Sequence, residues 1–348
     1  MAGSGPTHLM NALLEEAKFK PPPTAKEEHE SYIKGMTAHR LNHVEIIKAA
    51  KESTTPYKYY NEVTGTASSA SGINKKRMVH IASEIAGLSA DLPVEWYSGI
   101  YVRVDEDRPD VLKACIIAPE GTPYENGCFE FDILLPLDYP NVPPKVQIIT
   151  TSHGSVRFNP NLYNGGKVCL SLLGTWSGPG WIPGTSTLLQ VLLSIQSLIF
   201  VDKPYFNEPG YNASCASQQK QSDTYDRQIR AATLKVAMLG QMQKPSPLFE
   251  DCMNDHFRLK KRRILEQLDE WEALEEKNDK SGGSSGALVA GGGIRSTHKI
   301  VKEICDEIRN VYDPKEVDSD DEDAIRYNDY PNYCRITGAD AKQTSSNS

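Results

Sequence analysis

One cysteine lies in a loop of turn-forming residues, and it is the residue of this sequence best placed to do chemistry. The segment 157–173 reads RFNPNLYNGGKVCLSLL and brings Cys169 to the start of a short apolar run. Loops that a rigid scaffold positions often carry reactive groups, and a thiolate is a strong nucleophile. A lone cysteine, however, more often serves as a small buried apolar residue. Local composition therefore leaves both interpretations of Cys169 open.

The other residues with reactive side chains do not suggest a metal or a cofactor. The chain has seven cysteines, an odd number, with no CxxC pair, and its eight histidines show no HExxH or paired spacing. This pattern argues against a zinc site or a disulfide framework and favours reduced thiols in the cytoplasm, with the nucleus as a second setting. We expect no metal and no cofactor.

Charge and hydropathy exclude further classes of partner. The 348 residues carry 38 basic and 46 acidic side chains, a net charge of −8. A chain with this net negative charge is not expected to bind nucleic acid or an anionic membrane through broad electrostatic attraction. The longest apolar stretch, 188–201, is too short and too polar to span a bilayer, and the first 25 residues lack the pattern of a secretory signal, so we expect none.

The elements that must position the loop form an α+β pattern. Apolar residues at helical spacing follow Lys75, and Pro93 closes that segment. Four strands are then predicted, at 100–104, 111–117, 128–135 and 145–150. In the third strand Phe129, Phe131 and Ile133 alternate with acidic residues, which predicts one buried face and one face open to water. One helix and a four-stranded antiparallel meander are the expected core.

Further helices are predicted on either side of this core. A helix that is apolar on nearly all sides should begin at 185–187 and run to 200 as a central buried element. The N-terminal part should be helical over 26–51, and later helices should cover 224–242 and 248–278, with a short one near 300–311. We divide the chain into four parts. Residues 1–72 are an N-terminal extension, partly disordered and partly helical, and residues 73–245 are the core domain. Residues 246–280 are a helix packed on or near the core, and residues 281–348 are a flexible linker with an acidic tail.

The cysteine loop resembles the active-site loop of ubiquitin-conjugating (E2) enzymes, where a His-Pro-Asn triplet precedes the catalytic cysteine by eight positions. Here Asn159-Pro160-Asn161 takes that place. The first helix, the Pro-rich turn at 139–144 and the tryptophan before the buried helix are also similar in order and spacing. The resemblance covers about 75–239, implies the UBC fold, and is strongest to the very large hybrid E2/E3 members.

The resemblance implies a reaction and a set of partners. Cys169 would accept ubiquitin from the activating enzyme (E1) as a thioester and pass it to lysine amines of protein substrates, with an E3 ligase as an optional partner. This transfer needs an accessible thiol, so we expect Cys169 to be open to solvent. Asn161 would stabilise the oxyanion or hold the loop, although a turn residue that bonds its own backbone is an equal alternative. Asn207 or Glu208 would orient the incoming lysine.

The resemblance also implies two docking surfaces. Three basic residues at the start of the first helix would dock E1, although a solvated helix end explains them as well: Lys75, Lys76 and Arg77. Two loops would contact a ligase, through Asn141, Trp181 and Pro183. Asn141 replaces the large apolar residue that many E2 enzymes carry, and 176–180 lengthens the second loop. Direct substrate recognition without a conventional ligase is therefore expected.

Two other functions compete with conjugation. An inactive E2 relative that only binds ubiquitin is one, but such variants generally lack the cysteine that this chain keeps. A Cys-His hydrolase is the other, and it needs a base beside the thiol. The only histidine close in sequence is His153, which has no recognisable partner.

Overall fold

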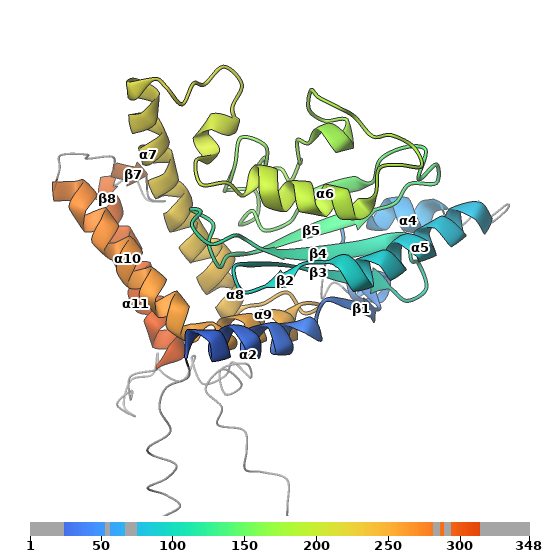
Figure 1. Cartoon of the computed structure of the whole chain (residues 1–348), viewed down its shortest axis with the longest axis horizontal. Helices are drawn as coiled ribbons and strands as arrows, with labels where there is room; N and C mark the ends of the chain where they lie inside the picture. The colour runs from blue at the N-terminus through green and yellow to red at the C-terminus, as the bar shows by residue number, and fades with distance from the viewer. Residues whose placement is uncertain (1–23, 53–55, 67–74, 281–285, 289–293, 314–348) are drawn as a thin grey trace, which may run out of the picture.

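The computed structural model describes residues 24–52, 56–66, 75–280, 286–288 and 294–313. A central sheet carries helices on both faces, and a group of helices stands at one end of it (Figure 1). The strands run in the order β1-β3-β4-β5-β6, with β2 also paired to β3. Their bounds are Leu41–Val44 for β1, Val94–Glu95 for β2, Ser98–Asp105 for β3, Val111–Ile117 for β4, Cys128–Leu134 for β5 and Lys145–Ile148 for β6.

The predicted four-stranded meander is present, and the N-terminal part adds a strand that the sequence did not predict. Strands β3 to β6 pair antiparallel in chain order. The expected helix over 26–51 is wrong at its centre, because α2 (Ala25–Thr37) and α3 (Ile46–Lys51) flank strand β1. Strand β1 pairs parallel with β3, with Leu41 opposite Val102. It satisfies backbone groups that would otherwise form an open sheet edge.

Helices α5 (Lys75–Asp91) and α6 (Leu188–Ser194) cover one face of the sheet, and α6 is drawn above the strands in Figure 1. The main hydrophobic cluster lies between them and the sheet and includes Phe129, Phe131 and Ile133, as the alternation predicted. Helix α6 starts where expected. The Thr187 hydroxyl accepts a hydrogen bond from the Gln190 N–H at 3.2 Å, and the Gln190 side chain accepts one from the Thr187 N–H.

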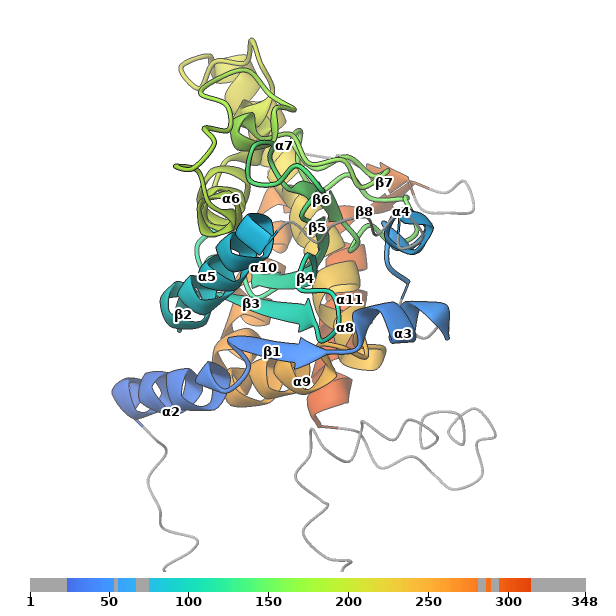
Figure 2. The same ribbon diagram turned by 90° about the vertical axis from the view of Figure 1, so that its right-hand side faces the viewer.

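The opposite face of the sheet is not open to water, so that expectation is wrong. Helices α2, α9 (Glu250–Leu259), α10 (Lys261–Lys280) and α11 (Thr297–Tyr312) contribute to a second hydrophobic cluster with strand residues such as Tyr101 and Cys115. Figure 2 shows α2 and α9 against the side of the sheet opposite α5 and α6. The acidic residues of β5 are buried there with a partner: Lys113 Nζ lies 2.5 Å from both Glu130 and Asp132. A buried charge needs such a partner.

The C-terminal helices differ in detail from the prediction. Helix α7 (Ala216–Ala232) begins before the expected residue 224 and continues through 233–239 into α8 (Gly240–Gln243). The single helix expected over 248–278 is two helices, α9 and α10, which separate at Lys260. The Lys260 side chain is buried and donates to the Trp96 carbonyl oxygen at 2.5 Å. Helix α11 confirms the short helix expected near 300–311 and packs on α10.

The proposed domain boundaries remain predictions. Residues 24–52 and 297–313, assigned to an extension and a tail, contribute to the hydrophobic clusters of the core. Short strands β7 (Gly286–Leu288) and β8 (Ile294–Ser296) pair within and beside the expected linker, and α4 (Tyr60–Thr66) lies in the N-terminal extension. Residues 1–23 of the N-terminal extension and residues 314–348, which contain the acidic tail, lie outside the described residues. Among the described helices none has the length and apolar character to cross a bilayer.

Candidate active site

The structure places Cys169 and Asn161 side by side in the loop between β6 and α6. The Cys169 N–H donates to the Asn161 carbonyl oxygen at 2.8 Å, and the Asn161 side-chain amide donates to the Cys169 carbonyl oxygen at 3.0 Å. Gly166 makes the turn between them with φ of +96°, in the left-handed region that favours glycine. These two hydrogen bonds fix the backbone on both sides of the thiol.

The backbone directs the thiol away from the main core. Val168 and Leu170 belong to the main hydrophobic cluster, whereas Cys169 between them does not. In an extended segment neighbouring side chains point to opposite faces, so the thiol faces the polar side of the loop. Charged side chains on that side, Arg157, Lys167 and Glu208, influence it electrostatically.

The thiol is less accessible than the sequence analysis expected. Cys169 is only 3% exposed, because the loop folds back on it through the Asn161 hydrogen bonds. Burial raises the pKa of the Cys169 thiol, the charges of Lys167 and Arg157 lower it, and Glu208 raises it. The expectation of an open thiol is corrected: the sulfur lies just beneath the surface, beside two cations that favour its thiolate.

Asn159 is the polar centre that holds this loop to the rest of the domain. Its side chain is fully buried and donates to the Tyr124 hydroxyl at 3.1 Å and to the Ile199 carbonyl oxygen at 2.8 Å. Its side-chain oxygen Oδ1 accepts hydrogen bonds from the Asn161 N–H at 2.8 Å and from the Asn207 side-chain amide at 3.3 Å. The residue at the position of the usual histidine therefore has a structural role.

The two candidates for orienting a lysine have different surroundings. The Asn207 side-chain amide donates hydrogen bonds to the Asn159 side-chain oxygen and, at 3.1 Å, to the Leu198 carbonyl oxygen. These bonds give Asn207 a structural role. The Glu208 carboxylate is 41% exposed and lies 3.6 Å from the Arg157 guanidinium. Of the two, only Glu208 is among the residues whose charge acts on the Cys169 thiol.

Arg157 is a site residue that the sequence analysis did not single out. Its guanidinium donates to the Pro160 carbonyl oxygen at 2.6 Å, lies 4.3 Å from the centre of the Tyr163 ring, and pairs with Glu208. A cation two residues before Asn159 was the only signal of this in the sequence. The partner Glu208 is distant along the chain and could not be paired with it from the pattern.

The basic cluster expected to dock E1 is divided by the structure. Lys75 and Lys76 are exposed. Arg77 is buried, with its guanidinium 3.0 Å from the Asp110 carboxylate and hydrogen bonds to the carbonyl oxygens of Leu135 and Pro136. Arg77 therefore ties α5 to the sheet, and its assignment to a docking surface is wrong.

The two loops expected to contact a ligase lie together. The Trp181 indole N–H donates to the Pro140 carbonyl oxygen at 2.7 Å, and its ring packs on Tyr139. Asn141 and Pro183 are exposed. Three exposed apolar side chains in the same loops were missed by the sequence analysis: Leu137, Val142 and Ile182. The surface keeps apolar contact groups even though Asn141 is polar.

A meander sheet crossed by a buried helix, with a cysteine held by an Asn-Pro-Asn loop, defines a ubiquitin-conjugating domain. The family model for ubiquitin-conjugating enzymes matches residues 81–233. The chain belongs to the ubiquitin-conjugating enzyme (E2) family and has its UBC fold, which confirms both predictions.

Named relatives extend the similarity beyond this domain. The chain is 40% identical over 333 residues to the human dual E2 ubiquitin-conjugating enzyme/E3 ubiquitin-protein ligase BIRC6, a match covering 93% of this chain and 7% of the relative. It is 48% identical over 202 residues to the probable ubiquitin-conjugating enzyme protein 17 of Caenorhabditis elegans, covering 57% and 28%. The probable ubiquitin-conjugating enzyme E2 25 of Arabidopsis thaliana is 50% identical over 175 residues, covering 49% and 27%. The chain thus spans less than a third of each of these relatives.

Proposed function

We propose that the chain accepts ubiquitin from E1 as a thioester on Cys169 and transfers it to lysine amines of protein substrates. The observation that carries this proposal is the pair of hydrogen bonds between Asn161 and the backbone N–H and carbonyl oxygen of Cys169, which fix the backbone of the cysteine against the asparagine. Retention of both residues supports a working enzyme over an inactive binding module.

In the first step the Cys169 thiolate attacks the carbonyl carbon of the ubiquitin thioester on E1. A new carbon–sulfur bond forms, and the E1 cysteine leaves as a thiolate. The positive charges of Arg157 and Lys167 favour the attacking thiolate.

In the second step a neutral lysine amine attacks the thioester carbonyl, and the carbonyl oxygen becomes an oxyanion. The Asn161 amide uses one N–H for the Cys169 carbonyl oxygen and has a second to donate to this charge. The amine gives up a proton as the tetrahedral intermediate collapses, and Cys169 leaves as a thiolate. Glu208, exposed and acidic, is the group we assign to orienting the amine and accepting its proton.

The partners of this reaction are part of the proposal. E1 and ubiquitin are required by the chemistry, and the exposed Lys75 and Lys76 keep the E1-docking role proposed for them. A separate ligase is optional, and the dual E2/E3 name of the human relative supports direct substrate transfer. The reduced thiols favour action in the cytoplasm or nucleus.

Cys215 is the rival nucleophile that an experiment must exclude. It is the one cysteine of the described residues that is not buried. The Ser217 hydroxyl and two backbone N–H groups at the start of α7 lower the pKa of its thiol. Intrinsic reactivity alone would therefore favour Cys215 over Cys169.

A charging assay with E1, ATP and ubiquitin separates the two cysteines. We expect the unmodified chain and Cys215→Ala to give a thiol-sensitive adduct on a non-reducing gel, and Cys169→Ala to give none. Loss of the adduct in Cys215→Ala, or its survival in Cys169→Ala, would overturn the assignment. A hydrolase is disfavoured because no histidine of the described residues hydrogen-bonds the Cys169 thiol.

A further inference from the structure

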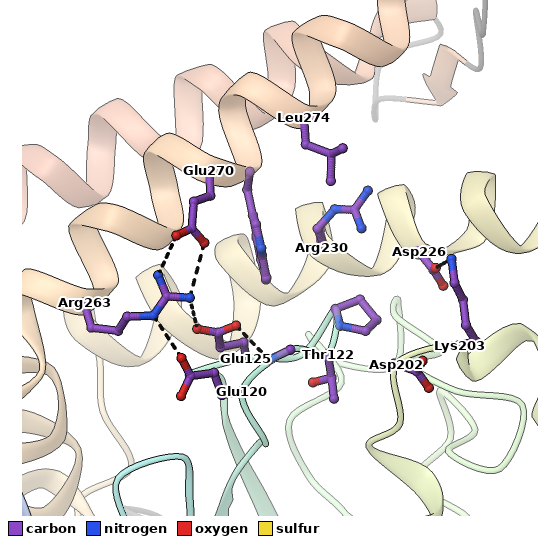
Figure 3. Close-up of a pocket in the computed structure, with 13 residues that line it drawn as sticks. Glu120, Thr122, Glu125, Asp202, Lys203, Asp226, Arg230, Arg263, Glu270 and Leu274 are labelled. Carbon is purple, nitrogen blue, oxygen red and sulfur yellow. Dashed lines mark hydrogen bonds and ion pairs between the residues drawn. The ribbon is translucent and has the colours of Figure 1, made fainter. Parts of the chain in front are cut away.

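An open cleft of about 660 Å³ lies where α7 and α10 meet the loop between β4 and β5. Figure 3 shows its charged residues projecting from these elements and from the segment after α6. Helix α10 lies outside the residues that the family model matches, so the cleft is not part of the shared domain alone. No step of the proposed reaction uses it.

The positive side chains of the cleft are already neutralised. Arg263 pairs with Glu125 at 2.8 Å, Glu270 at 3.0 Å and Glu120 at 3.3 Å. Lys203 lies 2.9 Å from Asp223 and 3.0 Å from Asp226. The third cation of the cleft, Arg230, pairs with Glu275 at 3.0 Å. An anionic ligand would have to displace a carboxylate from each cation that it contacts.

The acidic side chains retain unused hydrogen-bond acceptors. Five carboxylates line the cleft against three cations: Glu120, Glu125, Asp202, Asp226 and Glu270. The Asp226 side chain is only 5% exposed, and its Oδ1 accepts no hydrogen bond among the described residues. Asp202 is exposed and makes no ion pair with another described residue. The cleft therefore favours a ligand that brings positive charge and hydrogen-bond donors.

One wall of the cleft is apolar. Trp271 and Leu274 of α10 and Pro123 of the loop line the cleft, and the Leu274 side chain is partly exposed. Arginine and lysine have long aliphatic stems that pack on such surfaces while the charged end reaches polar groups. A cation over an aromatic ring gains further stabilisation. An arginine or lysine side chain fits this combination of walls better than a metal ion does.

The cleft is also connected to the catalytic loop. Tyr124 lies between the cleft residues Pro123 and Glu125, and its hydroxyl donates to the Phe158 carbonyl oxygen at 2.7 Å. On the other side, Lys203 directly precedes the 204–207 turn that leads to Glu208. Tyr124 and the 204–207 turn thus join the cleft to the loop that carries Cys169.

We propose that this cleft binds an arginine- or lysine-bearing segment of the protein substrate. The positive side chain lies against the carboxylates, and its aliphatic stem packs on Trp271 and Leu274. That the bound segment belongs to a substrate rests on the proposed function, whereas the binding itself does not.

The test measures binding of a fluorescein-labelled decapeptide of alternating arginine and leucine by fluorescence anisotropy. The protein carries Cys169→Ala, so the result does not depend on the thioester proposal. Asp202→Asn with Glu270→Gln removes two exposed charges of the cleft. Glu266→Gln with Glu276→Gln removes two exposed charges of α10 that do not line the cleft, and serves as the matched control.

We expect roughly tenfold weaker binding in the cleft variant, since each exposed ion pair contributes a few-fold, and at most twofold in the control. Leu274→Arg, which places the protein's own guanidinium in the cleft, should abolish binding. A peptide with glutamate in place of arginine should not bind. Equal affinity in the cleft and control variants, or equal binding of the glutamate peptide, would overturn the proposal.

A second measurement addresses the substrate role alone. The charged, unmodified chain should discharge faster onto a lysine peptide flanked by the arginine-leucine segment than onto the same peptide without it. The cleft variant should lose this preference while its discharge onto the plain peptide is unchanged. Intact preference in the cleft variant would show that substrates dock elsewhere, even where charging of Cys169 succeeds.

Discussion

Arg157 and Glu208 should change the reactivity of Cys169 in opposite directions. The Arg157 charge lowers the pKa of the Cys169 thiol, and the Glu208 charge raises it. Arg157→Gln removes the favourable charge and also leaves Glu208 without its partner at 3.6 Å, so both consequences raise the pKa. Glu208→Gln removes the unfavourable charge and lowers it.

The size of the effect follows from the exposure of the pair. Arg157 and Glu208 are 42% and 41% exposed, so solvent screens their charges. An exposed charge interaction of this kind contributes about 0.2–1 kcal/mol. At a fixed pH below the thiol pKa, the thiolate fraction should therefore fall about 1.4- to 5-fold in Arg157→Gln and rise by a similar factor in Glu208→Gln.

The assay is the rate of iodoacetamide alkylation against pH, measured by mass spectrometry on the peptide that carries residue 169. Arg157→Lys keeps the charge and should retain most of the wild-type rate, although it loses the planar contact with Tyr163. The double variant Arg157→Gln with Glu208→Gln should lie between the single variants. A rate in Arg157→Gln that equals or exceeds the wild-type rate would refute this electrostatic account.

Three further predictions follow from the site and the core. Asn161→Ala should charge normally but discharge onto lysine about a hundredfold more slowly, as for a lost oxyanion donor; wild-type discharge in a single-turnover assay would remove its role. Asn159→Ala should lower the free energy of unfolding in urea by about 2–4 kcal/mol, because the buried Asn161 N–H loses its acceptor and the Tyr124 hydroxyl loses a donor; a change within 0.5 kcal/mol would contradict this. Burial lowers the pKa of His256 to about 3, so the folded state keeps it neutral while the unfolded chain is protonated below about 6.5. Stability should be full above that pH and fall by about 1.4 kcal/mol per unit as the pH drops toward 3, and His256→Gln should remove this part of the slope in urea titrations at pH 7 and 5.

The central meander and the site pair could be predicted because their signals are local. Alternation in 128–135 placed Phe129 and Phe131 in the core. The spacing of eight residues between Asn161 and Cys169, with the family resemblance, predicted a contact that the loop now makes. The start of α6 was predicted at 185–187 in the same way, and Thr187 is its N-cap.

The elements that were mispredicted depend on partners far away in the chain. Glu130 and Asp132 suggested a face open to water, but both are buried, paired with Lys113, and the Lys58 N–H donates to the Asp132 carboxylate. Arg77 suggested a docking surface, but its side chain is buried in an ion pair with Asp110. Strand β1 is only four residues long, and its pairing with β3 comes from the sheet rather than from its own composition.

The exposure of the Cys169 thiol could not be predicted from the sequence either. A polar loop predicts an open thiol, whereas the hydrogen bonds of Asn161 fold the backbone closely around it. A site that is nearly closed in the isolated chain requires local movement or partner binding before the sulfur meets a thioester.

The central claim is that the sulfur of residue 169 carries ubiquitin, and the most direct measurement identifies the acylated atom. Replacing the sulfur by oxygen in Cys169→Ser should convert the thioester into an ester that resists thiols and is cleaved by alkali. Peptide mass spectrometry should then find the C-terminal glycines of ubiquitin on residue 169. The same label on residue 215 in place of 169, or a thiol-sensitive adduct that persists in Cys169→Ser, would contradict the account.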